Sequence, residues 1–84
     1  MNNNQIPLSQ LPMGKKARVA ALTSDGSARR RMLDLGIIDG TEIEPLYKSP
    51  SGNPVAYLIR GAVIALRSDV SEKIIVSNGE SLWD

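Results

Sequence analysis

A chain of 84 residues is long enough for one small domain and leaves little room for an enclosed active site. It contains neither cysteine nor histidine, which excludes disulfides, thiolate or imidazole metal sites, and Cys/His nucleophiles or bases. A net charge of +1 gives no global basic field for nucleic acid, and no apolar run approaches the ~20 residues that span a bilayer. We therefore expect a soluble, cytoplasmic protein that is not an enzyme and carries no cofactor.

Period-two patterns separated by turn residues predict five short strands. Leu8 and Leu11 precede Gly14 in an apolar, turn-like entry to the first strand. The predicted strands cover residues 16–22, 41–48, 55–60, 63–67 and 74–76, with a tight turn at 61–62 and a helical turn within 68–73. Polar residues flank this region, so we expect one domain over 6–76 between a disordered tail, 1–5, and a C-terminal tail, 77–84, which carries Trp83.

A short helix is predicted between the first two of these strands. Asp25 or Ser27 can cap its start, and Gly36 is suited to the left-handed conformation that ends a helix. At helical spacing, one narrow stripe is expected to face the core: Ala28, Met32 and Leu35. Leu33 lies off this stripe, where it is either a second core contact or a partly exposed apolar residue, and we favour the core contact.

Three consecutive arginines, Arg29, Arg30 and Arg31, lie near the start of this helix. A helix N-terminus already carries about half a positive charge, so cations there are unfavourable. Local folding therefore does not explain the cluster. Two explanations stay open: an internal ion pair, since Asp34 lies three residues after Arg31 and four after Arg30, or contact with a partner.

Five short strands with one inserted helix predict a mainly β fold, a small SH3-like antiparallel barrel that is partly open and has the helix after its first strand. Pro45 cannot donate to a strand ladder, so it predicts an edge strand or a bulge. Together with Glu42 and Glu44, it is typical of strands protected against pairing with another chain. This pattern disfavours a homodimer formed through an exposed strand edge.

Several separated motifs resemble the FeoA family in order and spacing. They are Leu8-x-x-Leu11-x-x-Gly14, Arg30-Arg31-Met32-Leu33-Asp34-Leu35-Gly36-Ile37, Gly40-Thr41, Gly52-Asn53-Pro54 and Gly61-x-x-Ile64-Ala65-Leu66-Arg67. The resemblance runs from about Leu8 to Val76. Asp39 stands where a proline often precedes the Gly-Thr turn, and Asn53 stands where an aspartate often follows the loop glycine; both residues are compatible with turns.

The resemblance implies an SH3-like barrel with an inserted helix, in agreement with the residue patterns. It also implies a small cytoplasmic protein of bacterial ferrous iron transport that acts beside FeoB, a membrane Fe(II) permease with a cytoplasmic GTP-hydrolysing domain. We expect an interaction module that is recruited to the inner face of the membrane by this transporter and modulates its assembly or GTP-coupled transport. Because arginine and tyrosine commonly anchor interfaces, the candidate partner-binding residues are Arg29, Arg30, Arg31, Leu33, Asp34, Tyr47 and Tyr57.

No bound metal and no nucleotide chemistry is expected. Without histidine or cysteine, a ferrous site would need clustered carboxylates. Asp39, Glu42 and Glu44 could hold a divalent ion weakly, but a solvated strand face is the favoured interpretation. The chain has no glycine-rich phosphate motif, so we do not expect hydrolysis, although its arginines could supply a charge to a nucleotide site of another protein.

The alternative functions are a small-barrel RNA-binding module and a generic protein-interaction module, since small barrels host many functions. Stacking of bases on a sheet needs aromatic side chains. The chain has no phenylalanine, and its aromatic residues are Tyr47, Tyr57 and Trp83. Binding of nucleic acid is therefore not expected, and the same scarcity disfavours an aromatic groove for proline-rich peptides.

Overall fold

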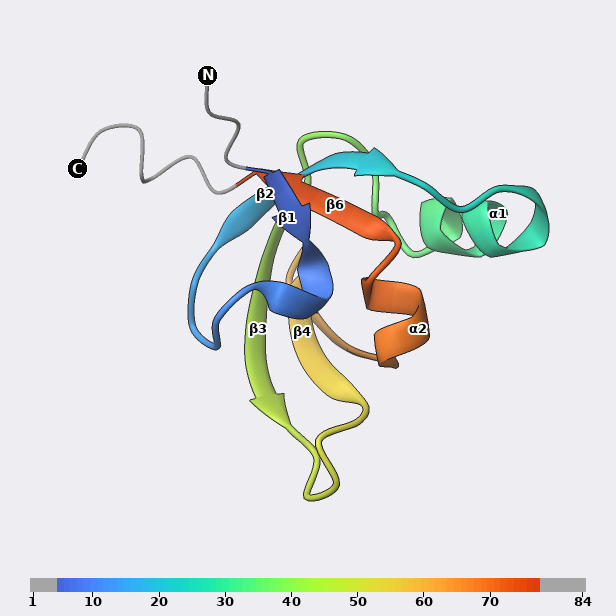
Figure 1. Ribbon diagram of the computed structural model, residues 1–84. Helices are drawn as coiled ribbons and strands as arrows, with labels where there is room; N and C mark the ends of the chain where they lie inside the picture. Colours follow the sequence, from blue (N-terminus) through green and yellow to red (C-terminus); the bar gives the residue numbers. More distant parts are fainter. Residues whose placement is uncertain (1–4, 78–84) are drawn as a thin grey trace.

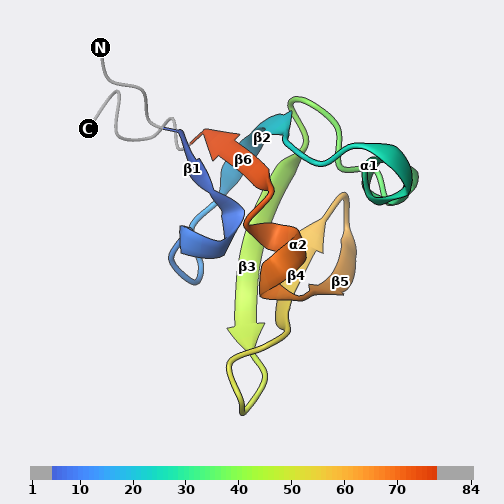
Figure 2. The same cartoon turned by 45° about the vertical axis from the view of Figure 1, so that its right-hand side comes forward.

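The computed structural model describes residues 5–77, which form one antiparallel sheet in the order β1-β6-β2-β3-β4-β5 (Figures 1 and 2). The strands are β1 (Gln5–Pro7), β2 (Ala17–Leu22), β3 (Glu42–Lys48), β4 (Val55–Ile59), β5 (Ala62–Leu66) and β6 (Ile74–Ser77). The helical segments are a 3-10 turn η1 (Leu8–Gln10), α1 (Gly26–Asp34) and α2 (Ser68–Ser71). The prediction of a mainly β fold with one inserted helix is confirmed.

One strand of the structure, β1, was not predicted from the sequence. β1 is three residues long and pairs antiparallel with β6, with Gln5 opposite Ser77. A three-residue strand that ends in proline carries no period-two signal. The inserted helix α1 therefore follows the second strand of the protein, β2, and not the first as predicted.

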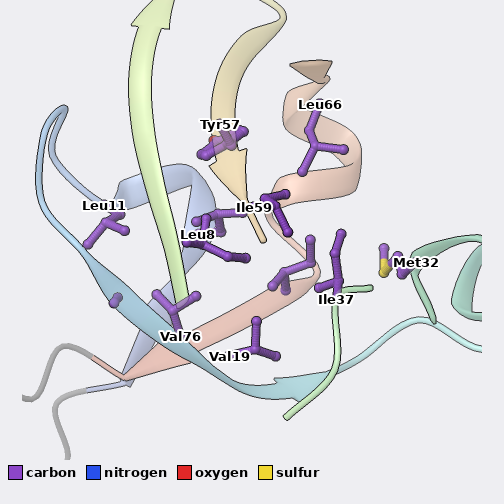
Figure 3. Close-up of a cluster of buried hydrophobic side chains, with 12 residues drawn as sticks. Leu8, Leu11, Val19, Met32, Ile37, Tyr57, Ile59, Leu66 and Val76 are labelled. Atoms are coloured by element: carbon purple, nitrogen blue, oxygen red, sulfur yellow. The ribbon is translucent and has the colours of Figure 1, made fainter. Parts of the chain in front are cut away.

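The core lies inside the curved sheet and is closed by η1 at one end (Figure 3). Burial of an aliphatic side chain contributes about 1.5–3 kcal/mol to stability, so a small set of such residues dominates the folding of a short chain. The fully buried aliphatic residues are Leu8, Ile37, Ile43, Ile59, Ile74 and Val76. They come from η1, the segment after α1, β3, β4 and β6, which ties distant parts of the chain together.

Pro45 lies at a bulge, one of the two placements predicted for it. The register between β3 and β4 shifts between Pro45 and Tyr47. Because β3 pairs with β2 on one side and β4 on the other, it is an inner strand. The prediction that Pro45, Glu42 and Glu44 protect an exposed edge is therefore wrong, since the end strands of the sheet are β1 and β5.

Helix α1 projects from one end of the sheet and touches the core through a single residue (Figures 1 and 3). Met32 is buried, and Leu35 just beyond the helix is partly buried against the core. Ala28 is exposed, so the predicted stripe is correct for Met32 and Leu35 and wrong for Ala28. Ala28 instead lines an open groove between α1 and β5. Asp25 is the N-cap residue, but its side chain makes no capping hydrogen bond.

The segment between α1 and β3 fixes the position of the helix. Gly36 has a φ of +88°, as predicted for the residue that ends the helix. The buried Thr41 hydroxyl donates to the Gly36 carbonyl oxygen at 3.0 Å and accepts from the Ile38 N–H at 3.3 Å. The Gly40 N–H donates to the Val19 carbonyl oxygen at 2.8 Å, which joins this segment to β2. The segment that follows the helix is therefore anchored to β2.

Replacement of Gly36 by alanine should destabilise the protein by about 1–2 kcal/mol from its left-handed backbone alone. The new Cβ would lie 2.6 Å from Cδ of Arg60, but this long side chain is exposed and can move aside, so little further loss is expected. Gly14→Ala is the matched control, since Gly14 has a φ of +82° and no neighbouring atom within 4 Å of the added Cβ. Denaturant unfolding measures both, and we expect similar losses; a much larger loss for Gly36→Ala would contradict the free movement of the Arg60 side chain.

Candidate interaction surface

The outer face of α1 combines charge with an exposed apolar side chain. Arg29, Arg30, Leu33 and Asp34 line a shallow hollow of about 310 Å³ together with Gly26. Leu33 is 42% exposed, so the favoured prediction that it packs in the core is wrong. The cause is the narrow contact between α1 and the sheet, which has room for Met32 alone. The sequence patterns therefore predicted the basic cluster correctly but assigned Leu33 to the core instead of the surface.

Within residues 5–77, the arginines of α1 form no ion pair with Asp34, the internal partner considered from the sequence. Arg29 instead donates from Nη1 to the Leu22 carbonyl oxygen at 3.3 Å, which helps to hold the helix against β2. Arg30 and Arg31 are exposed, and their guanidinium groups are available to a partner. Of the two explanations for the cluster, contact with a partner is the one that this arrangement supports.

Arg31 lies on a different side of α1 from Arg30 and borders an apolar groove. The groove has a volume of about 410 Å³ and separates α1 from β5 and α2. Its apolar lining comes from Met32, Leu35, Ile64, Leu66 and Val70. None of the residues from β5 was a candidate in the sequence. The available signal was the unbroken apolar run Ala62–Leu66, but a buried strand has the same composition, so the run did not indicate a groove.

The two candidate tyrosines have opposite environments. Tyr57 is 2% exposed in the core, so the prediction that its ring contributes to an exposed interface is wrong. Tyr47 is 60% exposed, but it lies near the end of β3 that is remote from α1 (Figure 1). Tyr47 is thus the one exposed aromatic residue among residues 5–77, and Trp83 lies outside the described residues. A single exposed ring does not form a stacking platform for nucleic-acid bases.

Burial raises the pKa of the Tyr57 phenol above its ordinary value of 10.0, and a hydrogen bond with Ser71 offsets part of this rise. The neutral phenol therefore contributes stability that is fully present below pH 10 and is lost as the pH rises through the raised pKa. In strong alkali, the free energy of unfolding of the wild type should fall relative to that of Tyr57→Phe. Tyr47→Phe should follow the wild type, because Tyr47 is exposed. Denaturant unfolding across the alkaline range tests this, and parallel profiles for wild type and Tyr57→Phe would contradict it.

The carboxylates of β3 share their surface with basic groups. Glu42 and Glu44 line a hollow of about 290 Å³ with Lys16, Thr41 and Arg60. Among residues 5–77, no group of three or more carboxylates lies close enough together to hold a metal ion. Within the same residues, no helix has the length and apolarity required to cross a membrane.

A family model described as the FeoA domain matches residues 6–78. A FeoA-like protein from Clostridium acetobutylicum is 32% identical, with 93% of this chain and 90% of that chain aligned and a TM-score of 0.82. The FeoA protein of Chlorobium tepidum is 30% identical over 87% of this chain and 70% of its own, with a TM-score of 0.81. The zinc complex of Stenotrophomonas maltophilia FeoA, described as a prokaryotic SH3 domain protein, is 27% identical over 83% and 87% of the chains, with a TM-score of 0.74. No curated protein matches the sequence.

Proposed function

The chain belongs to the FeoA family, and from this premise we propose that it is a non-enzymatic accessory protein that binds the cytoplasmic part of a FeoB-type Fe(II) transporter. FeoA proteins act in ferrous iron transport, and the fold is SH3-like. To this family role the proposal adds the transporter as the binding partner and the outer face of α1 as the binding surface. The protein would modulate the assembly of the transporter or its GTP-coupled transport from the cytoplasm, and the partner would recruit it to the inner face of the membrane.

The observation that carries this proposal is the outer face of α1. Arg30 is exposed without an ion pair in the described part of the chain, beside the exposed apolar side chain of Leu33. Arginine beside apolar area is the combination that most often dominates the energy of a protein–protein interface. Arg31 lies in the last turn of α1, so the expectation that all three arginines stand at the unfavourable end of the helix is wrong, and it is their exposure that favours contact with a partner. Their presence is explained if a partner supplies the carboxylates.

The position of α1 supports the same assignment. The helix projects from the sheet and touches the core through one residue, so most of its surface is open to a large partner (Figure 2). Thr41 and Gly40 hold the segment after it to β2 by hydrogen bonds, which fixes the orientation of the helix before any partner binds. A surface that is already ordered avoids much of the entropy cost of association. Tyr47 lies too far from α1 to belong to this surface and is not part of the proposed site.

Titration of the whole protein into the detergent-solubilised transporter of the same genome tests the proposal, with the isolated GTP-hydrolysing domain titrated in parallel. We expect saturable binding that weakens as salt rises, because exposed charges are screened beyond roughly 10 Å at 0.1 M salt. GTP hydrolysis by the transporter is then measured with and without the protein. Binding to the complete transporter without any change in hydrolysis or iron uptake would remove the modulatory role. Absence of binding to either form, with the protein folded, would contradict the partner itself.

A further inference from the structure

Strand β5 is an end strand of the sheet, and it lacks the features that usually prevent edges from pairing. Its sequence, Ala62–Leu66, contains no charge and no proline, and its pairing with β4 runs without a bulge. Val63 is 59% exposed. Natural proteins normally blunt such an edge with charges, prolines or bulges, or cover it. An unprotected apolar edge therefore indicates a strand that another segment covers.

The apolar groove described above runs beside this edge. Its lining comes from three elements: Met32 of α1, Ile64 and Leu66 of β5, and Val70 of α2. Arg31 and Arg67 also line it, and within the described residues neither guanidinium forms an ion pair. The groove thus offers apolar contacts together with two uncompensated positive charges. A complementary occupant would have a short apolar centre between two carboxylates.

The sequence of this chain contains a segment with that chemistry. Residues 78–84 read Asn-Gly-Glu-Ser-Leu-Trp-Asp, in which Leu82 and Trp83 lie between Glu80 and Asp84. We propose that the groove between α1 and β5 binds residues 78–84 of a second copy of this protein. Leu82 and Trp83 would cover the apolar lining, and the two carboxylates would neutralise Arg31 and Arg67. Charge-assisted contacts with arginine are about twice as strong as neutral hydrogen bonds.

The position of Ser77 favours a second copy over the same chain. In β6, Ile74 pairs with Leu22, close to the start of α1, whereas Ser77 pairs with Arg18 at the opposite end. The chain therefore leaves β6 at the end that is remote from the groove. Seven residues span at most about 25 Å when fully extended, and about 10 Å of this reach would be used in running back along β6. About 15 Å of reach would remain to carry the chain from this end of β6 into the groove of the same molecule, which favours a second copy as the source of the segment.

Trp83 is the only tryptophan, so its fluorescence reports its environment in the unmodified full chain. We expect the emission to shift to shorter wavelength as protein concentration rises, in step with an increase in mass measured by sedimentation. A chain that ends at Ser77 should remain a monomer over the same range. Solvent-exposed emission from a monomer at every concentration would overturn the proposal. A short-wavelength emission that does not depend on concentration would also overturn it, since the segment would then bind within its own molecule.

Two further comparisons place the segment in this groove. Ala28→Glu introduces a negative charge at an exposed residue that lines the groove, and should weaken association at least about tenfold, or 1.4 kcal/mol. Ser27→Glu adds the same charge to the same exposed helical turn outside the groove and should change association by less than about twofold. Equal effects of the two variants would contradict the assignment of the groove.

Exchange of the charges tests the ionic contacts. Reversal of Arg31 and Arg67 to glutamate should weaken association, and so should reversal of Glu80 and Asp84 to arginine in the otherwise unmodified chain. The chain that carries all four changes should associate again, because each pair of charges is restored with opposite sign. Failure of this rescue would overturn the pairing. None of these experiments contains the transporter, so their failure would leave the proposed function intact.

Discussion

Replacement of Arg29, Arg30 and Arg31 by alanine should weaken binding to the transporter at least about 100-fold, because interface arginines commonly contribute more than about 1 kcal/mol each. The melting temperature should change by no more than a few degrees. Arg29 loses one exposed hydrogen bond to the Leu22 carbonyl oxygen, and within the described residues Arg30 and Arg31 form no ion pair that could be lost. Titration calorimetry and thermal unfolding of the same preparations measure both quantities.

The control for this variant keeps the change in charge and moves it elsewhere. Alanine at Lys16, Lys48 and Lys73 removes three positive charges from exposed positions outside α1. This variant should bind within about threefold of the wild type, since long-range charge mainly alters association rates. Equal weakening by both triple variants would show that net charge, and not the position of the arginines, causes the loss of binding. A loss of stability without a loss of binding would assign the arginines a structural role.

Met32→Ala should lower the free energy of unfolding by about 2–5 kcal/mol, more than any other alanine substitution in α1. Met32 is 3% exposed and is the one buried side chain of α1, so its truncation leaves a cavity that no other helical residue fills. The helix should undock, and binding to the transporter should fall with it. Urea unfolding gives the free energy, and hydrogen exchange of the α1 amides reports the undocking.

Leu33→Ala is the matched control for Met32→Ala. Leu33 is the next residue of the same helix and is 42% exposed, so its truncation should change stability by less than about 0.5 kcal/mol. It should still weaken binding, because Leu33 belongs to the proposed interface. Similar losses of stability in the two variants would contradict the single-residue attachment of α1.

The five strands from β2 to β6 and the helix α1 could be predicted because their signals are local. Alternation, turn glycines and the stop at Gly36 depend on a few neighbouring residues. β1 could not be predicted, because three residues have no period and Gln5–Pro7 becomes a strand only by pairing with β6. The bulge at Pro45 was one of two predicted outcomes, and the choice depends on the number of neighbours of β3, which is set by tertiary topology.

The charge of the candidate surface could be predicted, but the burial of its side chains could not. The positions of Arg29, Arg30 and Arg31 follow from their place on a short helix. The exposure of Leu33 and the burial of Tyr57 do not, because both depend on how much of each element the core covers. In β4, the consecutive residues Ala56 and Tyr57 are both buried, so the alternation of apolar and polar residues could not assign Tyr57 to a face of the sheet. Its burial is favoured by the contact of its hydroxyl with Ser71 of α2, a long-range pairing.

The groove beside β5 had no signal of its own in the sequence. It exists because α1 projects from the sheet and leaves a gap to β5 and α2, an arrangement of three separate elements. An apolar strand such as Ala62–Leu66 has the same composition whether it lies in the centre of a sheet or at its edge. Only the strand order shows that it is an edge.

The most direct test of the central proposal, that α1 contacts the transporter, uses the absence of cysteine from the chain. A single cysteine at Leu33 is labelled with an environment-sensitive fluorophore, and the labelled protein is titrated with the solubilised transporter. The same label at Tyr47, which is exposed but remote from α1, is the control. We predict a saturable change in emission at position 33 and none at position 47. A saturable change at position 47 alone, or binding without a change at position 33, would contradict the account.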